Sequence, residues 1–325
     1  MSMTAEQIVD RRRIRRKLSF WRFIAVVAVI VVVAVALFAA GTRSGLVPRE
    51  PQIARITVSG FIADNRDETE MLAKLAKDPA VKGVIVAIDS TGGSTTGGEA
   101  LYENLRKLAD AKPTTATIGT FGASAAYMAA IATDHIVARR TSLTGSIGVL
   151  FEYPEVSDLL TRLGVKVEDI KSAPLKASPN PFEPTSDEAR AVIQGVVADT
   201  FGWFVDIVAE RRNLPRDQAL TLADGRIYTG NQALGVKLID EIGGEDQALA
   251  WLGTKGVDTK LPVKDWRPDT SGRGFPFANA AIDWLLQTSG LGQLIPTSIV
   301  DRLLPPSLKL DGLLSLWQGQ AGGNE

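Results

Sequence analysis

Two segments rich in small residues carry groups that could catalyse acyl transfer. One is residues 89–94, with two adjacent glycines, and the other is residues 121–127, which contain Ser124. Each follows a short apolar run and precedes residues with helical periodicity, so each should lead into a helix whose first N–H groups are unpaired and carry positive potential. A serine hydroxyl beside such donors has the arrangement of a nucleophile next to an oxyanion hole. Ser124 also has a simpler alternative role, because serine is a common helix N-cap.

A serine nucleophile needs a base, and the composition leaves few side chains for that role. Histidine occurs once, at His135, eleven residues after Ser124. Across a mostly helical stretch that separation is about 15 Å, which argues against a Ser–His–Asp triad and favours a structural role for His135. The remaining type of base is a lysine whose pKa is lowered by burial. Spacing alone does not identify that lysine.

The composition excludes several other kinds of site. Cysteine is absent and histidine occurs once, so thiolate and multi-histidine metal sites cannot form, and we expect neither a metal nor a cofactor. The 36 basic and 37 acidic residues are interspersed except at the N-terminus, which argues against a nucleic-acid partner. With 325 residues, 45% of them hydrophobic, the chain can bury a substantial core.

The N-terminal region predicts a single membrane anchor. Residues 1–22 form a basic tail, and residues 23–42 form an apolar segment long enough to cross about 30 Å of hydrocarbon. The basic residues lie mainly before this segment, so the tail should be cytoplasmic and everything after the segment extracytoplasmic. A cleavable leader is the alternative, since residues 34–36 (Ala-Val-Ala) resemble a cleavage site, but the apolar run is longer than such leaders usually have.

The rest of the chain alternates short apolar runs with helical patterns, which is typical of an α/β domain. After a linker at residues 43–52, the domain is expected to span residues 53–264, and residues 265–325 form a C-terminal extension with apolar patches that could dock on the domain, a partner subunit or the membrane. Strands are predicted at residues 53–59, 83–88, 115–119, 135–138 and 146–151. Helices are predicted at residues 97–111, 123–132, 246–253 and from a capping box at 185–188 to about residue 212, the last with one apolar stripe from Ala189 to Val208.

Four motifs occur in the order and spacing of one known family. They are Asp-Ser-Thr-Gly-Gly-Ser at 89–94, Gly-Ala-Ser-Ala-Ala-Tyr at 122–127, Thr-Gly-Ser-Ile-Gly-Val at 144–149, and Ala-Asp-Gly-Arg-Ile-Tyr-Thr-Gly at 223–230 with Glu-Ile-Gly-Gly at 241–244. Over residues 53–252 the chain therefore resembles bacterial signal peptide peptidase A in its short, single-repeat form. The resemblance implies a Clp-protease/crotonase-like spiral of ββα units, preceded by one transmembrane helix in the bacterial inner membrane, with the catalytic domain periplasmic or otherwise extracytoplasmic.

The resemblance also assigns the site residues. It makes Ser124 the nucleophile, Lys176 its general base and Ser146 the hydroxyl that orients the lysine amine. The backbone N–H groups of Gly93 and Ala125 become the oxyanion hole. In short members of the family the serine and the lysine come from neighbouring subunits, which implies a ring-shaped homo-oligomer, with an octamer as the candidate size.

The activity implied is that of a serine endopeptidase that cleaves apolar peptides such as remnant signal peptides. Lys171 is a rival for the base and ranks behind Lys176. Two departures from the family pattern, Ala125-Ala126 in place of two glycines and Thr91 in place of proline, should narrow the cleft without removing a catalytic group. Two other functions compete: a crotonase-like acyl-CoA enzyme, which the anchor argues against, and a non-catalytic membrane scaffold, in which Ser124 would not react with an electrophile.

Overall fold

The computed structural model describes residues 21–27, 30, 50–268 and 314–316. The chain divides into two compact units, residues 1–50 and 51–325. In the first unit, residues 21–27 are helical and their side chains are exposed. The rest of the predicted anchor at 23–42 and most of the predicted extension at 265–325 lie outside the described residues.

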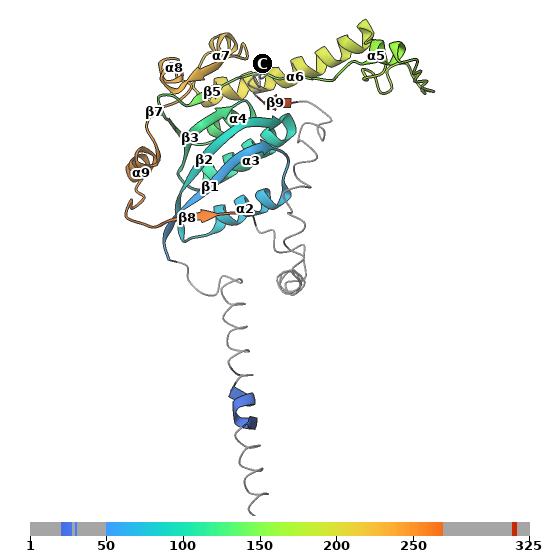
Figure 1. Cartoon of the computed structure of the whole chain (residues 1–325). Coiled ribbons are helices and arrows are strands. Elements are labelled where there is room, and N and C mark those ends of the chain that lie inside the picture. Colours follow the sequence, from blue (N-terminus) through green and yellow to red (C-terminus); the bar gives the residue numbers. More distant parts are fainter. Residues whose placement is uncertain (1–20, 28–29, 31–49, 269–313, 317–325) are drawn as a thin grey trace, which may run out of the picture. The chain divides into compact units, whose positions relative to one another are not determined.

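The second unit is built on a mainly parallel sheet, seen in Figure 1 with helices packed against it. Its central strands are β1 (Gln52–Ile62), β2 (Val81–Ser94) and β3 (Thr114–Ala123), which pair in parallel. Helices α2 (Arg66–Lys77) and α3 (Thr95–Ala111) connect these strands, as parallel pairing requires. The α/β class predicted from the sequence is therefore confirmed.

Further elements extend the sheet on both sides. Toward one edge the order continues from β3 to β5 (Leu143–Gly145) and β6 (Ile227–Thr229), and toward the other from β1 to β8 (Val263–Trp266). A side branch of β4 (His135–Ala138) and β7 (Glu241–Ile242) pairs with β3. The remaining elements are α7 (Arg216–Leu222), α8 (Gly230–Gly235), α9 (Glu245–Thr254) and β9 (Leu314–Leu316).

The core forms where the apolar strands meet a helix made of small residues. Val84, Ile85 and Val86 of β2 are fully buried, as expected for a strand covered on both faces. All seven residues of α4 (Ala125–Ile131) are buried. A side chain at Gly98 of α3 would lie 2.9 Å from the Cβ of Ala125, so glycine and alanine let α3 and α4 approach closely. This packing fixes the start of α4, where Ser124 lies.

The largest differences from the predicted boundaries fall at two strands and at the end of the domain. The strand predicted at 83–88 continues through the glycine-rich segment to Ser94, because that segment keeps pairing with β1 as far as Gly93. The strand predicted at 146–151 is wrong. Strand β5 ends at Gly145, and Ser146 has φ of 48°, a left-handed conformation that turns the chain out of the strand; Leu150 forms only an isolated bridge. In addition, β8 pairs with β1 as far as Trp266 and so crosses the expected domain boundary at residue 264.

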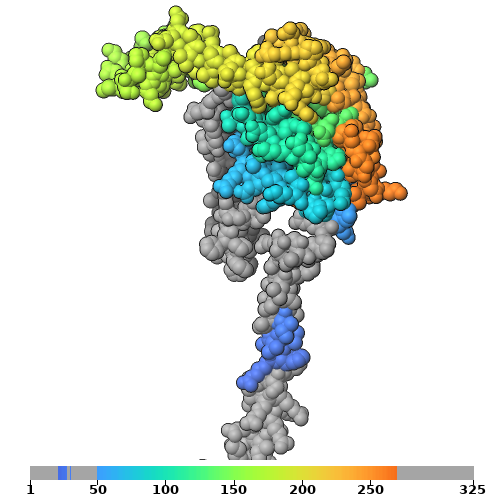
Figure 2. Space-filling view, turned by 180° about the vertical axis from the view of Figure 1, so that it is seen from behind, coloured from blue at the N-terminus to red at the C-terminus, as the bar shows by residue number. Residues whose placement is uncertain are grey.

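Beyond Ser146 the chain forms a projection that we call the arm, defined as residues 147–200. It contains α5 (Ser157–Arg162) and the first half of α6 (Asp187–Arg211), and it extends away from the sheet (Figures 1 and 2). The side chain of Ser186 caps α6 by accepting a hydrogen bond from the Ala189 N–H. The predicted single stripe along this helix is only partly buried: Phe204, Ile207 and Val208 lie in the core, whereas Val196 is 42% exposed.

Candidate active site

Ser124 lies at the sharp turn between β3 and α4. It is 1% exposed, and its backbone has φ of 61° and ψ of −122°, a conformation that non-glycine residues rarely adopt. Its N–H donates to the carbonyl of Gly145 at 2.8 Å, which ties the turn to the end of β5. Although Ser124 precedes a helix, its side chain makes no capping hydrogen bond. The N-cap alternative considered for this serine therefore does not account for its position.

Because the backbone at Ser124 is strained, two substitutions that both remove the hydroxyl should differ in their effect on stability. Ser124→Gly should raise the free energy of unfolding by about 1 kcal/mol, because it relieves strain of about 1–3 kcal/mol and costs about 0.5–1 kcal/mol in chain entropy. Ser124→Ala retains Cβ and should leave stability within about 0.5 kcal/mol of wild type. Urea titration of both variants tests this expectation. Equal stability of the two variants would show that the turn stores no strain.

Ser146 is held beside the same turn. It follows Gly145, the residue whose carbonyl accepts from Ser124, and its own N–H donates to the carbonyl of Arg226 at 2.8 Å. Ser146 is 8% exposed. Gly145 has φ of 84°, and a Cβ there would lie 2.7 Å from the ring of Tyr228. The pairing of β5 with β3 thus brings Ser146 next to Ser124 in space, although 22 positions separate them in the sequence.

The Gly92–Gly93 segment reaches the same edge of the sheet from β2. Parallel strands β2, β3 and β5 all end here, so their last residues lie close together. A Cβ on Gly93 would lie 1.9 Å from the carbonyl oxygen of Ile62, which only glycine avoids. Gly93 therefore lets the β2 backbone run tightly against β1 at the point where an oxyanion donor is expected.

Two polar side chains in this segment position the site, and the sequence reasoning did not single them out. The Ser90 hydroxyl donates to the carbonyl of Gly60 at 2.6 Å and accepts from the N–H of Gly92 at 3.1 Å, which shapes the glycine turn. The Asp89 carboxylate accepts from the N–H of Phe121 at 3.0 Å and so links this turn to the strand that leads to Ser124. Their place directly after a buried strand was the available signal.

The start of α4 supplies the other expected donor. The N–H groups of Tyr127 and Met128 donate back to the carbonyl of Ser124, at 2.9 and 3.1 Å. In the described part of the chain the N–H of Ala125 makes no such bond, as is usual for the first residue of a helix. The hydroxyl of Tyr127 donates to the carbonyl of Leu238 at 2.8 Å and anchors the helix. The Ala125 N–H therefore lies beside Ser124 on a firmly held helix.

The two candidate lysines lie in the arm, in the segment between α5 and α6. Lys176 is exposed, and within the described residues its side chain makes no hydrogen bond or ion pair. Lys171 pairs with Glu183 and with Asp169, and the hydrogen bond to Glu183 raises the pKa of Lys171. A raised pKa disfavours the neutral amine that a general base requires. Lys171 instead fits a structural role, because Glu183 also accepts from Ser178 and Asn180 in the loop that carries Lys176.

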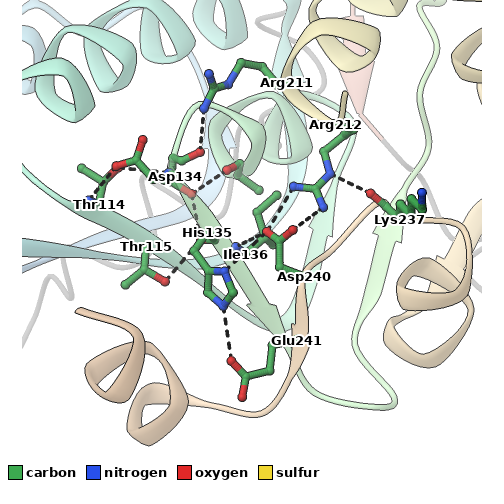
Figure 3. A network of polar contacts seen from close by, with 12 residues as sticks. Thr114, Thr115, Asp134, His135, Ile136, Arg211, Arg212, Lys237, Asp240 and Glu241 are labelled. Atoms are coloured by element: carbon green, nitrogen blue, oxygen red, sulfur yellow. Dashed lines mark hydrogen bonds and ion pairs between the residues drawn. The ribbon is translucent and has the colours of Figure 1, made fainter. Parts of the chain in front are cut away.

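His135 lies at the opposite end of the sheet from Ser124. It pairs with Thr115 near the start of β3, whereas Ser124 follows the end of that strand. Its ring stacks on Trp251 at 5.0 Å, and its Nε2 lies 3.3 Å from Glu241 (Figure 3). The neighbouring Asp240 accepts from the N–H of Ile136 and pairs with Arg212. These contacts join β4 to β7, to α9 and to Arg212 at the end of the sheet away from Ser124, which agrees with the structural role predicted for His135.

The described residues offer no cluster that would bind a metal. Among residues 21–27, 30, 50–268 and 314–316, no group of three or more His, Asp or Glu side chains has suitable geometry. The groups placed at this edge of the sheet include the hydroxyls of Ser124 and Ser146 and the backbone N–H groups of Gly93 and Ala125. Such groups suit covalent catalysis by serine with an oxyanion hole.

Comparison with known proteins agrees with this chemistry. Residues 106–258 match the model of peptidase family S49. A Methanocaldococcus jannaschii protein named provisionally as a protease is 38% identical over 58% of this chain and 61% of its own length. A Synechocystis protein with a similar name is 34% identical over 64% of this chain and 76% of its own length. An Enterococcus faecium protein named provisionally as signal peptide peptidase SppA is 32% identical over 80% of this chain and 77% of its own length.

Proposed function

We propose a specific function for this chain, which belongs to peptidase family S49 and is a serine peptidase. In this proposal it is a membrane-anchored Ser–Lys endopeptidase of Clp-protease/crotonase-like architecture. Its substrates are apolar peptides such as remnant signal peptides. The observation that carries the proposal is the convergence of Ser124, Ser146 and Gly93 at the ends of three adjacent parallel strands. The chain spans 61% of the length of the first of its relatives above, so the substrate class is our own inference.

The proposed reaction uses each of these groups in turn. The Ser124 hydroxyl attacks the carbonyl carbon of a peptide bond, and its proton passes to the neutral amine of Lys176. The N–H groups of Gly93 and Ala125 stabilise the negative charge on the carbonyl oxygen. Lys176 returns the proton to the departing amine, and a water molecule then releases the acyl group by the reverse path. Ser146 accepts or donates a hydrogen bond that holds the amine in place.

We place Lys176 in the active site of a neighbouring subunit. Twelve large hydrophobic side chains are exposed in the described part of the second unit, and ten of them lie in the arm that carries Lys176, between Leu150 and Val196. Monomeric proteins rarely expose so many together, so a second copy is the natural cover for the arm. A ring of subunits, each offering its lysine to the next, supplies both the cover and the base. An octamer remains the candidate size.

The exposed apolar surface of α6 has another candidate explanation, since this helix is the only one in the described segments that is long and apolar enough to cross a membrane. Within α6, 22% of the 18-residue stretch that is apolar enough to span a membrane is buried. Asp199 lies at its middle, and a carboxylate at the bilayer centre costs about 2.5–3.5 kcal/mol. The far end of α6 is also packed in the core through Phe204 and Ile207. These features favour a protein contact for α6, and residues 23–42 remain the proposed anchor.

The proposed location is the bacterial inner membrane, with the N-terminus in the cytoplasm and the catalytic domain outside it. The basic tail before the apolar segment supports this orientation. An anchor also suits the substrate class, because apolar peptides left after secretion stay in the membrane. No cofactor is required by the proposed chemistry.

The proposal is tested with the full chain in detergent micelles and an apolar fluorogenic peptide. Ser124→Ala should reduce kcat by about 10³-fold or more, because it removes the nucleophile. A fluorophosphonate should add its mass to the wild type and not to this variant. Ser59→Ala, at an exposed serine of β1, is the control and should behave as wild type. Undiminished hydrolysis by Ser124→Ala would refute the assignment, and a wild type that neither hydrolyses nor labels would favour the scaffold alternative.

A further inference from the structure

The side chains of the fourth sequence motif, residues 223–230, take no part in the reaction proposed above. In the structure this motif forms a bend at residues 224–226, which is followed by β6. Strand β6 pairs with β5 in the antiparallel direction, so that Ile227 lies opposite Gly145. The 224–226 bend therefore lies directly beside Ser146, the residue that follows Gly145 in the chain.

The carboxylate of Asp224 closes this bend. Its Oδ1 accepts a hydrogen bond from the backbone N–H of Arg226 at 3.1 Å, and both of its oxygens accept from the Arg226 Nε, at 2.9 and 2.6 Å. These bonds, first from the Arg226 side chain and then from its backbone N–H, hold the pKa of Asp224 below its usual value. Between the two residues Gly225 has φ of 83°, a left-handed conformation that glycine adopts without strain.

Ser146 needs a support of this kind because its own backbone is strained. A left-handed conformation is costly for a residue other than glycine, and it persists only where the surroundings hold it. The contact that holds Ser146 is the hydrogen bond from its N–H to the carbonyl of Arg226. The chain after Ser146 also passes the bend, since a Cβ on Gly148 would lie 3.6 Å from the Cα of Gly225. The direction of the Ser146 hydroxyl therefore depends on where the bend places the Arg226 carbonyl.

The backbone hydrogen bond of the bend should carry this effect, and the ion pair should add little to it. The side chains of Arg226 and Asp224 are 66% and 39% exposed, and solvent weakens ion pairs that are exposed to this degree. The bond from the Arg226 N–H to Asp224, in contrast, fixes the backbone two residues along the chain, as Asp and Asn side chains commonly do in turns. Asparagine has a carbonyl oxygen that can accept this bond, whereas alanine has no acceptor.

We infer that Asp224 is a positioning residue of the active site. By closing the 224–226 bend it fixes the Arg226 carbonyl that holds the backbone of Ser146, and so it aims the Ser146 hydroxyl at the amine of Lys176. The inference rests on the proposed function for the roles of Ser146 and Lys176. The effect of Asp224 passes through the backbone of Arg226 and Ser146, without contact with the reacting atoms.

The kinetic test uses the full chain in detergent micelles with an apolar fluorogenic peptide. Asp224→Ala should lower kcat about tenfold and change KM less than twofold, because a displaced group beside the reacting atoms slows the chemical step. Asp224→Asn, which keeps the acceptor, should retain at least about half of the wild-type kcat. The matched control is Asp258→Ala, since the exposed Asp258 accepts from the N–H of Lys260 at 2.9 Å in a similar bend near the start of β8. This control should leave kcat unchanged.

A second substitution tests whether Asp224 acts through Ser146. In a Ser146→Ala background there is no hydroxyl to aim, so Asp224→Ala should lower kcat less than about twofold further. A full additional tenfold loss in that background would overturn the inference. Wild-type kcat in Asp224→Ala would overturn it too, as would equal losses in Asp224→Ala and Asp224→Asn.

Hydrogen exchange supplies a measurement that does not depend on activity. Asp224→Ala should speed exchange at the Ser146 amide about tenfold, measured by mass spectrometry of peptides that cover residues 144–149, while Asp224→Asn should not. The melting temperature of both variants should match wild type, because residue 224 is exposed. Unchanged exchange in Asp224→Ala would overturn the inference. A wild type that lacks hydrolysis, together with faster exchange in Asp224→Ala, would refute the proposed function and leave the support of Ser146 by Asp224 standing.

Discussion

Alanine at Lys176 should lower kcat/KM for an apolar peptide by about 10³-fold or more, the size of effect expected when a base that activates a serine is removed. The folded core should be unaffected, because the Lys176 side chain is exposed and makes no polar contact within the described part of its own chain. Steady-state kinetics of the full chain in detergent micelles, with thermal melting of the same samples, measures both quantities.

Two other lysines of the arm provide controls. Lys166→Ala, at an exposed position, should leave kcat/KM unchanged. Lys171→Ala should cost about tenfold, because the ion pair of Lys171 with Glu183 holds the loop that carries Lys176, and small displacements of a catalytic group are costly. An inactive Lys171→Ala together with an active Lys176→Ala would reverse the assignment of the base.

Mixing the inactive Ser124→Ala and Lys176→Ala proteins tests whether sites are shared. In a randomly mixed ring, a site is complete when its serine comes from the lysine variant and its lysine from the serine variant, so about one quarter of wild-type activity should return. The mixture must be allowed to exchange subunits, for example by brief dissociation and reassembly. Activity that stays at zero after proven exchange would place both groups in one chain.

Alanine at Gly93 is the second substitution with a large expected effect. Its Cβ would lie 1.9 Å from the carbonyl oxygen of Ile62, so the backbone must shift and the N–H at this position must move. Loss of one oxyanion donor costs about 10²–10³-fold in kcat. Overpacking should also cost about 1–3 kcal/mol of unfolding free energy.

Gly235→Ala, the last residue of α8, is the matched control because a Cβ there meets nothing within 4 Å. It should leave kcat unchanged and stability equal or slightly higher. A Gly93→Ala enzyme with wild-type kcat would remove Gly93 from the oxyanion hole, whatever its stability.

Much of the fold could be predicted from local patterns. The strand at His135–Ala138 was predicted with its observed bounds, and the helix ending at Ala111 begins two residues earlier than expected. The capping-box pattern at residues 185–188 placed the beginning of α6 to within one residue, because a cap is a signal contained in four residues, although the cap in the structure is Ser186 and not Thr185. Local rules succeed where the determining contacts lie close in the sequence.

The failures arise where distant contacts decide. The sequence predicts a turn in the glycine segment after residue 88, yet pairing with β1 keeps it extended. The sequence predicts a strand from Ser146 onward, yet the left-handed conformation of Ser146 directs the chain into the arm. The apolar pattern of α6 does not reveal which half meets the core and which half stays exposed. Tertiary pairing overrides local preference in each case.

In the candidate site, too, some residues could be predicted from local patterns and others depend on distant contacts. Ser124 and Gly93 were predicted from small-residue turns after buried strands, and the fold brings these turns to one edge of the sheet. The roles of Ser90 and Asp89 depend on partners about 30 residues away, which spacing could not identify. Lys176 came from family resemblance, and its assignment stays a prediction because its own chain gives it no partner among the described residues.

The exposed arm has a further consequence for the thermodynamics of the molecule. Its large apolar side chains, among them Leu163 at 67% and Ile170 at 105% exposure, contribute little to the stability of an isolated chain. Burial against a second copy would stabilise them only at protein concentrations that favour association, because such stabilisation follows mass action. The sheet and the arm then have different stabilities: the sheet's is set by its own core, and the arm's rises with the local density of subunits. Confinement to a membrane surface would raise that density, so the proposed anchor would help to order the arm that carries the proposed base, Lys176.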